Sequence, residues 1–255
     1  MRCQDVADRL NDRLDIAAYA GADASANGLQ IGPADHDVDT VAFADDGAVE
    51  TLEAAAEHDA DLLVVHHGIS WGGIERVTGR EYDRIAAALD NDLALYAAHL
   101  PLDGHQELGN AAGIADLLEL GEREPFGTYG GEFIGQRGRL SEPTPLPDVT
   151  DTLAGELQSE DNDVRTLEFG PTEIRDVAIV TGSGVDWLDE AIEAGADLLV
   201  TGEGKQSVYH EARESGINVV LGGHYATETF GVRALQSLAE KWELETTYLD
   251  HPTGL

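Results

Sequence analysis

Short apolar runs alternate with amphipathic stretches over most of the chain, and this alternation is the first guide to the fold. The apolar runs indicate strands, and the stretches with apolar positions every three or four residues indicate helices. In the first part of the chain the pattern predicts strands over 40–45, 61–65 and 93–98 and helices over 47–58, 80–89 and 110–118. In the last part it predicts strands over 177–180, 198–201 and 219–221 and helices over 186–194, 205–214 and 227–241. Strands that alternate with helices are typical of parallel β-α-β units, so the predicted fold class is a layered α/β fold.

The stretch between these two parts has a different composition, rich in glycine and proline. Within it, 132–140 predicts a small strand or hairpin and 149–158 a short helix. The sequence therefore predicts a first α/β lobe over 1–122, a connecting segment over 123–175 and a second α/β lobe over 176–255.

The two predicted lobes are also similar residue by residue. Residues 52–64 (LEAAAEHDADLLV) and 188–200 (LDEAIEAGADLLV) align without a gap at an offset of 136, and eight of the 13 positions are identical. The match favours an internal duplication over the alternative, that two helix–turn–strand units converged on one composition. In this register His67 corresponds to Glu203.

Two adjacent histidines, His66 and His67, stand at the end of a predicted strand and are followed by Gly68. Neighbouring side chains inside a strand point to opposite faces, whereas at a strand end both rings can address neighbouring metal ions. An isolated pair of this kind most simply indicates a solvated loop. Its interpretation therefore depends on the residues that accompany it.

A second pattern recurs in both lobes. His99 follows two small residues and precedes Asp103 by four positions, and His224 follows two small residues and precedes Glu228 by four. A histidine and a carboxylate at this spacing share one face of a helix or converge in a tight turn. One such pair is weak evidence in an acidic chain, but two pairs at matching strand ends are much stronger evidence for a functional site.

The net charge of −35, from 50 acidic and 15 basic residues, is extreme. The acidic residues are spread along the chain and only two residues are lysines, a composition that resembles proteins of salt-accumulating halophiles. No basic stripe is available to contact phosphates of a nucleic acid, so a nucleic-acid partner is not expected.

Cys3 is the single cysteine, which fits a reducing cytoplasm, and no apolar run approaches the roughly 18 residues of a membrane span. We therefore expect a cytoplasmic protein with no membrane partner.

With these residues assembled, the chain resembles the Nif-three-like family, whose members are also labelled GTP cyclohydrolase I type 2 homologues. The motifs that carry the resemblance follow one another along nearly the whole chain: 27–32 (NGLQIG), 61–68 (DLLVVHHG), 99–103 (HLPLD), 109–111 (GNA), 201–203 (TGE), 223–228 (GHYATE) and 232–235 (VRAL).

The resemblance implies two similar α/β lobes with a dinuclear metal site between them and a ring-shaped homo-oligomer, often a hexamer. It implies that His66 and Asp103 bind one metal ion, that His67 and His224 bind the other, and that Glu228 bridges the two. The large domain that some members insert between the lobes is absent or minimal, because 121–176 is too short to hold it.

Imidazole and carboxylate ligands without a thiolate suit zinc, iron, manganese, cobalt or nickel better than calcium. Five ligands for two ions leave open positions, which is typical of a catalytic site. The leading hypothesis is a metal-dependent hydrolase that acts on a nucleotide or another small substrate. The alternative is a non-catalytic metal-binding protein that serves metal handling or regulation.

Other polar residues are candidates for supporting roles. His99, Glu203 and His210 are candidate catalytic groups, and His105 lies close to Asp103 in sequence. Trp71 could wall a pocket, and residues 182–184 (GSG) could place a phosphate at a helix N-terminus, although a lone GxG is a weak signal. No basic cluster stands out for a triphosphate, and the only contributors are Arg76, Arg80, Arg84 and Arg233.

Overall fold

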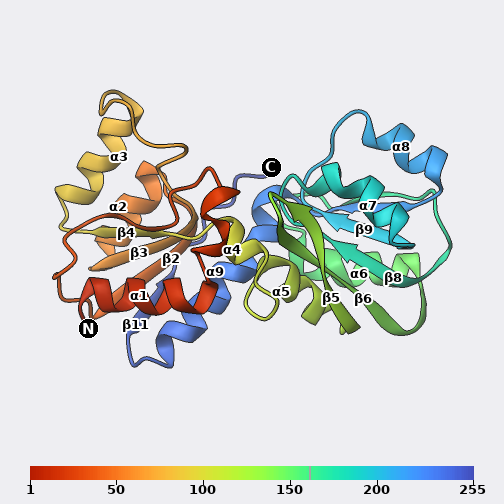
Figure 1. Ribbon diagram of the computed structural model, residues 1–255, viewed down its shortest axis with the longest axis horizontal. Helices are drawn as coiled ribbons and strands as arrows, with labels where there is room; N and C mark the ends of the chain where they lie inside the picture. Colours follow the sequence, from red (N-terminus) through yellow and green to blue (C-terminus); the bar gives the residue numbers. More distant parts are fainter. Residues whose placement is uncertain (161) are drawn as a thin grey trace. The chain divides into compact units, whose positions relative to one another are not determined.

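The computed structural model describes residues 1–160 and 162–255, which form two compact units (Figure 1). Unit 1 comprises Met1–Leu102 and Gly231–His251, and unit 2 comprises Asp103–Phe230 and Pro252–Leu255. These bounds differ from the predicted lobes over 1–122, 123–175 and 176–255. The segment expected to connect the lobes belongs to the sheet of unit 2, and most of the C-terminal stretch belongs to unit 1.

Unit 1 is built on a five-stranded sheet in the order β1-β4-β3-β2-β11. Its strands are β1 (Gly28–Ile31), β2 (Thr40–Asp46), β3 (Leu62–His67), β4 (Ala94–Ala97) and β11 (Glu245–Tyr248). The four strands from β4 to β11 run parallel, as the alternating pattern predicts, whereas β1 pairs antiparallel with β4. Strand β1 was not predicted from the sequence, and it adds an antiparallel edge to the parallel strands that were.

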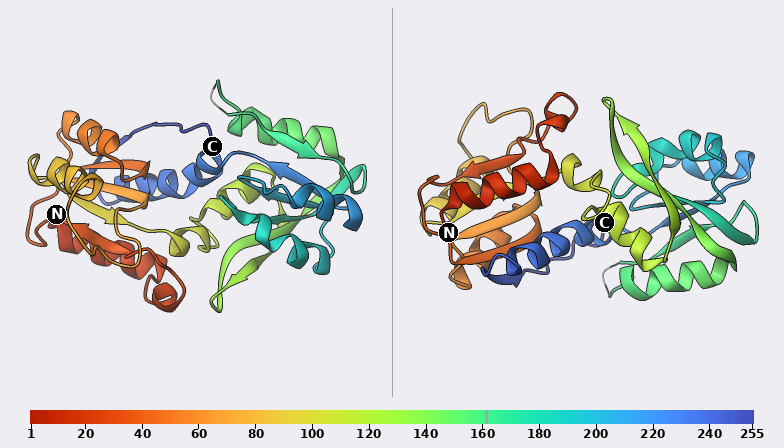
Figure 2. Two further views of the ribbon diagram at one scale, coloured as in Figure 1. Left: turned by 90° about the horizontal axis from the view of Figure 1, so that it is seen from above. Right: turned by 60° about the horizontal axis from the view of Figure 1, so that its bottom comes forward.

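Helices cover both faces of this sheet (Figure 2). The helices of unit 1 include α1 (Cys3–Leu14), α2 (Val49–Glu57) and α3 (Arg80–Leu89), with a short 3-10 turn over Ala18–Gly21. Leu63 and Leu95 point to one face and pack with Leu52 of α2, whereas the Tyr96 hydroxyl, on the other face, donates to Asn11 of α1 at 3.0 Å. Strands that are buried on both faces need continuous apolar runs, which is why β3 and β4 are visible in the sequence.

Unit 2 is built on a six-stranded mixed sheet in the order β5-β6-β8-β9-β10-β7. Its strands are β5 (Gly121–Tyr129), β6 (Glu132–Pro145), β7 (Arg165–Leu167), β8 (Glu173–Ile179), β9 (Leu198–Thr201) and β10 (Asn218–Leu221). Strands β8, β9 and β10 run parallel, whereas β5, β6 and β7 add antiparallel pairs. The predicted small hairpin is the long β5–β6 pair, drawn in green in Figure 1.

The core of unit 2 lies between this sheet and the helices α5 (Asn110–Leu117) and α6 (Leu146–Leu157). A 3-10 turn over Gly184–Trp187 leads into α7 (Leu188–Glu193), and α8 (Val208–Ser215) precedes β10. Two helices continue from one unit into the other along the chain: α4 (Leu100–Asp103) and α9 (His224–Glu240). No helix of the described residues is long and apolar enough to span a bilayer.

The sequence repeat has a counterpart in the backbone of each unit. Val41 of β2 pairs with Leu62 of β3, and Val177 of β8 pairs with Leu198 of β9, in each case at positions 136 residues apart. The Asp61 carboxylate accepts two backbone N–H bonds, from Asp39 and Thr40 at 2.8 and 2.9 Å. The Asp197 carboxylate accepts bonds of the same lengths from Arg175 and Asp176. The same local unit, with the same carboxylate support, thus occurs twice.

These paired carboxylates give a test of the repeat. We expect Asp61→Ala and Asp197→Ala each to lower the free energy of unfolding by about 1–3 kcal/mol, because each leaves two backbone N–H donors without their acceptor. Urea unfolding of the full chain in high salt measures both values. Glu57→Ala and Glu193→Ala, exposed helix positions that are also 136 residues apart, are the controls and should stay within about 0.5 kcal/mol of the parent. Equal losses in all four variants would contradict the assigned role.

Candidate metal centre

The candidate site in unit 1 starts at the carboxyl end of β3. Gly68 follows the histidine pair, and a Cβ at this position would lie 2.6 Å from the Ala97 Cβ and collide with the Gln30 side chain. Only glycine fits this close approach, and the chain turns there. The rings of His66 and His67 consequently lie on the same side, with centroids 4.6 Å apart, instead of on opposite faces of the strand.

His99, just after the neighbouring strand β4, joins this pair. Its ring centroid lies 5.1 Å from that of His66 and 5.6 Å from that of His67. One ring nitrogen from each of the three histidines lies within 4.8 Å of the others, a spacing that could hold a metal ion. The carboxyl ends of parallel strands thus assemble three imidazoles, which is where α/β sheets place ligand sites.

Each of these histidines has its Nδ1 held by an oxygen. The Nδ1 of His66 lies 2.9 Å from the Ala98 carbonyl oxygen, that of His67 3.0 Å from Asp46 Oδ1, and that of His99 2.9 Å from Asp23 Oδ1. Since these oxygens accept hydrogen bonds, each Nδ1 carries the proton and donates it. The lone pair of each ring is then on Nε2, the arrangement of metal-ligating histidines whose other nitrogen is held by a carboxylate or carbonyl.

Asp23 was not identified from the sequence, because it lies in a loop far from the histidines along the chain. Burial alone would raise the pKa of Asp23, but hydrogen bonds and charge attraction from His99, with further bonds from Asn27 and the Ser25 amide, hold that pKa below its ordinary value. Asn27 also accepts the His99 backbone N–H at 2.7 Å. The start of the NGLQIG motif therefore fixes the end of β4.

The same motif fixes the end of β3 through Gln30. Its side-chain oxygen accepts the Ile69 backbone N–H at 2.8 Å, and its amide nitrogen donates to the Ala26 carbonyl at 2.8 Å. At the end of β2, Asp45 and Asp46 both approach the Nδ1 of His67, at 3.6 and 3.0 Å. These two carboxylates, which sequence reasoning also missed, make a second group with His67 that could hold a metal ion.

Unit 2 carries its own set of polar side chains. His224 is the first residue of α9, and its Nε2 lies 3.0 Å from the carboxylate of Glu228, one turn further on. Its Nδ1 lies 3.1 Å from Glu203 Oε1, so His224 has the same carboxylate support as the histidines of unit 1. Glu203, predicted as a catalytic candidate, thus lies where it orients His224.

Hydrogen bonding explains the electrostatics of Glu203. The hydrogen bond from the Ser183 hydroxyl lowers the pKa of this carboxyl, and His224 lowers it further, against an opposing effect of burial. Ser183 belongs to the GSG stretch, the candidate phosphate cradle. Its hydroxyl instead supports Glu203, and the neighbouring Gly182 carbonyl accepts backbone N–H bonds from Gly202 and Glu203.

Asp103 is held at the start of unit 2. Its Oδ1 accepts a hydrogen bond from the Asn110 amide at 2.8 Å and one from the Thr181 hydroxyl at 3.2 Å. Gly182, which follows Thr181, has φ +56°. A Cβ at Gly182 would collide with the Glu228 carboxylate and lie 3.2 Å from His224 Nε2. Asp103 and the His224–Glu228 pair therefore flank the same short segment of unit 2.

The remaining candidate histidines lie outside these groups of side chains. The Nδ1 of His105 accepts the backbone N–H groups of Glu107 and Leu108 at 3.1 and 3.0 Å, so its ring holds a turn. His210 is exposed on α8, where its ring lies 5.3 Å from that of Tyr209. The five predicted metal ligands are thus divided between the two units: His66 and His67 lie in unit 1, whereas Asp103, His224 and Glu228 lie in unit 2. Their roles as ligands of two ions stay a prediction.

Comparisons with known proteins place the whole chain among relatives of one kind. The model of a family described as Duf34/NIF3 (NGG1p interacting factor 3) matches residues 1–253. A protein of Halobacterium salinarum named "GTP cyclohydrolase 1 type 2 homolog" is 58% identical over 255 residues, all of both chains, and one of Pyrococcus abyssi with the same name is 43% identical over 256 residues, again with full coverage.

Solved structures agree with these sequence comparisons. The structure of TTHA1606 from Thermus thermophilus is similar with a TM-score of 0.89 and 38% identity, and that of protein ybgI, described as of unknown function, with 0.89 and 31%. Both comparisons cover all of each chain. The mixed α/β fold with its two sheets is therefore shared with these proteins.

Gly182 provides a test of the site in unit 2. We expect Gly182→Ala to lower metal affinity about 10- to 100-fold, because the added Cβ displaces the Glu228 carboxylate. Gly195→Ala is the matched control, since Gly195 also has positive φ (+74°) but open space around a Cβ. Both variants pay the cost of about 1–2 kcal/mol for left-handed backbone. Metal content after dialysis against a graded chelator separates them, and equal retention by both would contradict the assignment.

Proposed function

The chain belongs to the Duf34/NIF3 (NGG1p interacting factor 3) family, and from this premise we propose that it is a hydrolase that depends on two divalent metal ions. In this proposal His66 and Asp103 hold one ion, His67 and His224 hold the other, and Glu228 bridges them. Units 1 and 2 then contribute to a single dinuclear site between them. We further propose that the two units arose by internal duplication, which their equivalent registers and carboxylate supports favour.

One observation carries the proposal. Each histidine assigned as a ligand, His66, His67 and His224, has its Nδ1 against a carbonyl or carboxylate oxygen at 2.9 to 3.1 Å. Metal-ligating histidines usually receive such support, because it sets the tautomer and aims Nε2. The exposed His58 has a similar contact with the Ala54 carbonyl of its own helix, so the support counts here because each of the three histidines also belongs to a group of side chains that could hold a metal ion.

The path of the chain also supports a single site. Asp103 is the first residue of unit 2 and lies only four positions after His99 of unit 1. Glu228 lies two residues before the point in α9 where the chain passes to Gly231 of unit 1. Two of the three covalent passages between the units thus adjoin assigned ligands, and the third lies between His251 and Pro252. The first two favour one shared site over two separate ones.

The ligand set suits zinc, iron, manganese, cobalt or nickel. Divalent ions held in this way supply Lewis acidity and lower the pKa of a water molecule, which is what hydrolysis at neutral pH requires. The chain's own residues orient the ligands through Asp46, Glu203 and the Ala98 carbonyl. His99, held by Asp23 beside the ligand pair, is placed to move a proton.

We propose a nucleotide or another small molecule as the substrate, which the naming of the relatives supports. The net charge of −35 favours a protein that works in the cytoplasm at high salt, where self-repulsion is screened. The family resemblance supports a homo-oligomeric ring, with a hexamer as the expected size.

Metal content tests the site directly. We expect the purified protein to hold about two divalent ions per chain and His67→Ala and Glu228→Ala each to lose metal, since each removes a donor from the shared set. Elemental analysis of the full chain gives the content. His58→Ala, an exposed histidine at the end of α2, is the matched control and should retain both ions. If the wild-type protein binds no metal after incubation with divalent ions, the proposal is overturned.

Activity separates the hydrolase from a non-catalytic metal-binding protein. We expect His99→Gln to keep the metal content but to lower kcat by about 100-fold or more, because it removes a proton-transfer group and leaves all five assigned ligands in place. Loss of metal in this variant would instead make His99 a ligand, which its grouping with His66 and His67 allows. Steady-state hydrolysis of GTP, other nucleotides and phosphoesters, in high salt with manganese, iron or zinc, measures it. A metal-loaded wild type that is inactive on the whole panel would favour the non-catalytic alternative.

A further inference from the structure

A cavity of about 330 Å³ in unit 1 adjoins the histidine cluster. It is lined by residues from the stretch that follows β3 and from the first half of α3. Its volume is in the lower part of the range of sites that bind small organic molecules.

Trp71 forms the wall on the side of the metal centre. Its ring lies nearly perpendicular to that of His99, with centroids 4.9 Å apart, and the His67 ring lies at 6.0 Å. Its Nε1–H donates to the Gly68 carbonyl at 3.0 Å, and 43% of its surface stays exposed. The indole is thus fixed beside the candidate ligands while it offers an apolar surface to the cavity.

The backbone around Trp71 is held as firmly as its ring. The Ala26 N–H donates to the Ser70 carbonyl at 3.0 Å, and the Gly72 N–H donates to the Ala24 carbonyl at 2.6 Å. Ile74, 39% exposed, adds a second apolar side chain to the lining. An ordered indole with an exposed surface in a cavity is suited to a planar ring, because flat aromatic surfaces pack on one another.

Three arginines, Arg76, Arg80 and Arg84, line the same cavity. Arg80 and Arg84 are one helical turn apart on α3 and so share a face. Arg80 contacts Glu81 at 3.4 Å, whereas within the part of the chain that the structure describes neither Arg76 nor Arg84 forms an ion pair. In a chain with 15 basic and 50 acidic residues, this concentration of arginine is unusual.

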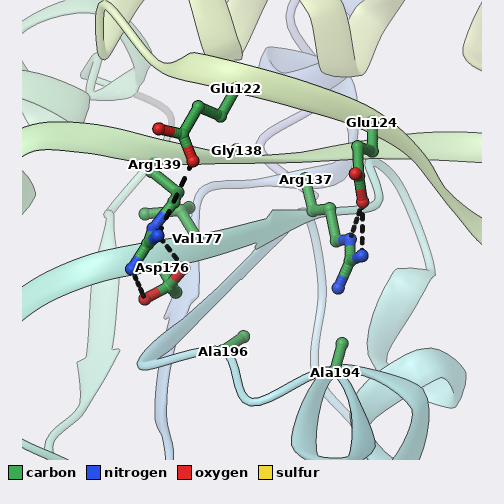
Figure 3. Close-up of a pocket in the computed structure, with 9 residues that line it drawn as sticks. All are labelled: Glu122, Glu124, Arg137, Gly138, Arg139, Asp176, Val177, Ala194 and Ala196. Atoms are coloured by element: carbon green, nitrogen blue, oxygen red, sulfur yellow. Dashed lines mark hydrogen bonds and ion pairs between the residues drawn. The ribbon is translucent and has the colours of Figure 1, made fainter.

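A second cavity, of about 210 Å³ in unit 2, shows what such arginines look like when their charge is used within the protein (Figure 3). There Arg137 is bound by Glu124, and Arg139 lies 2.9 Å from Asp176 and 3.6 Å from Glu122. Every arginine of that cavity already faces a carboxylate, so it offers no charge to an anion. The cavity in unit 1 differs because, among the residues that the structure describes, neither Arg76 nor Arg84 lies within ion-pair distance of a carboxylate, while the charge of Arg84 acts on Glu81 from further away.

We propose that the cavity beside Trp71 binds a small anion that carries a planar ring, the chemical class of the nucleotides, with the ring on Trp71 and the phosphate groups on Arg76 and Arg84. Guanidinium groups match phosphate oxygens in pairs of parallel hydrogen bonds. The two carboxylates of the lining, Glu75 and Glu81, can accept bonds from ring N–H groups. This inference rests on the proposed function, because it names the substrate class of the same site.

Binding of three probes to the full chain with its metal ions tests the proposal. The probes are GTP, guanosine and inorganic triphosphate, measured by isothermal titration calorimetry at one fixed high salt concentration. We expect R76Q/R84Q to weaken GTP and triphosphate binding by about 10-fold or more, since it removes two charged hydrogen-bond donors. We expect Trp71→Leu to weaken GTP and guanosine by about 10-fold and to leave triphosphate unchanged.

The matched control is R165Q/R175Q, which removes the same charge from exposed positions of unit 2 and should bind all three probes as the parent does. Because phosphate also binds divalent ions, affinities are compared only between samples of equal metal content. Equal binding by R76Q/R84Q and the control, or no binding of any probe to protein that holds two ions, would overturn the cavity proposal and leave the metal-site proposal standing. If the variants show the expected changes in affinity but the protein holds no metal, the cavity proposal stands and the metal-site proposal is overturned.

Discussion

The close approach of the backbone at Gly68 to Ala97 and Gln30 is the constraint on which the candidate metal centre depends. A strand would normally send the rings of His66 and His67 to opposite faces. The turn that Gly68 permits brings their centroids to 4.6 Å, and Gln30 locks that turn through the Ile69 amide. The cavity wall depends on the same point, because the Trp71 indole donates to the Gly68 carbonyl. The candidate metal centre and the cavity wall thus both depend on the end of β3.

The acidic character of the chain also serves the site. Most carboxylates lie on the surface, but Asp23, Asp46 and Glu203 lie against histidine Nδ1 atoms, where a charged acceptor orients the ring and raises its basicity as a ligand. Local hydrogen bonds, from His99 and Asn27 to Asp23 and from Ser183 and His224 to Glu203, hold the pKa of each of these carboxyls below its ordinary value against the opposing effect of burial.

Much of the fold could be predicted from the sequence, because β3, β4 and β9 are buried on both faces and are therefore apolar up to their carboxyl ends. The repeat over 52–64 and 188–200 was visible for the same reason. The local pattern could not show which distant segments pair. Strand β11, near the C-terminus, pairs with β2 in the sheet of unit 1. Strands β5 and β6 extend the sheet of unit 2 beyond β8. Asp23, Asp45 and Asp46 were missed because a carboxylate that supports a histidine has no signature along the chain.

The supporting bonds also separate the histidines by role, which spacing alone does not. His99 and His105 both lie close to Asp103 in sequence, yet Nδ1 of His99 donates to a carboxylate whereas Nδ1 of His105 accepts two backbone N–H groups. In the neutral ring the first arrangement leaves a lone pair on Nε2 and the second puts the proton there. Only the first can offer Nε2 to a metal ion or a substrate proton without a change of tautomer. The hydrogen bond on the far side of each ring, rather than the distance between residues in the sequence, therefore decides which histidines can take part in the chemistry.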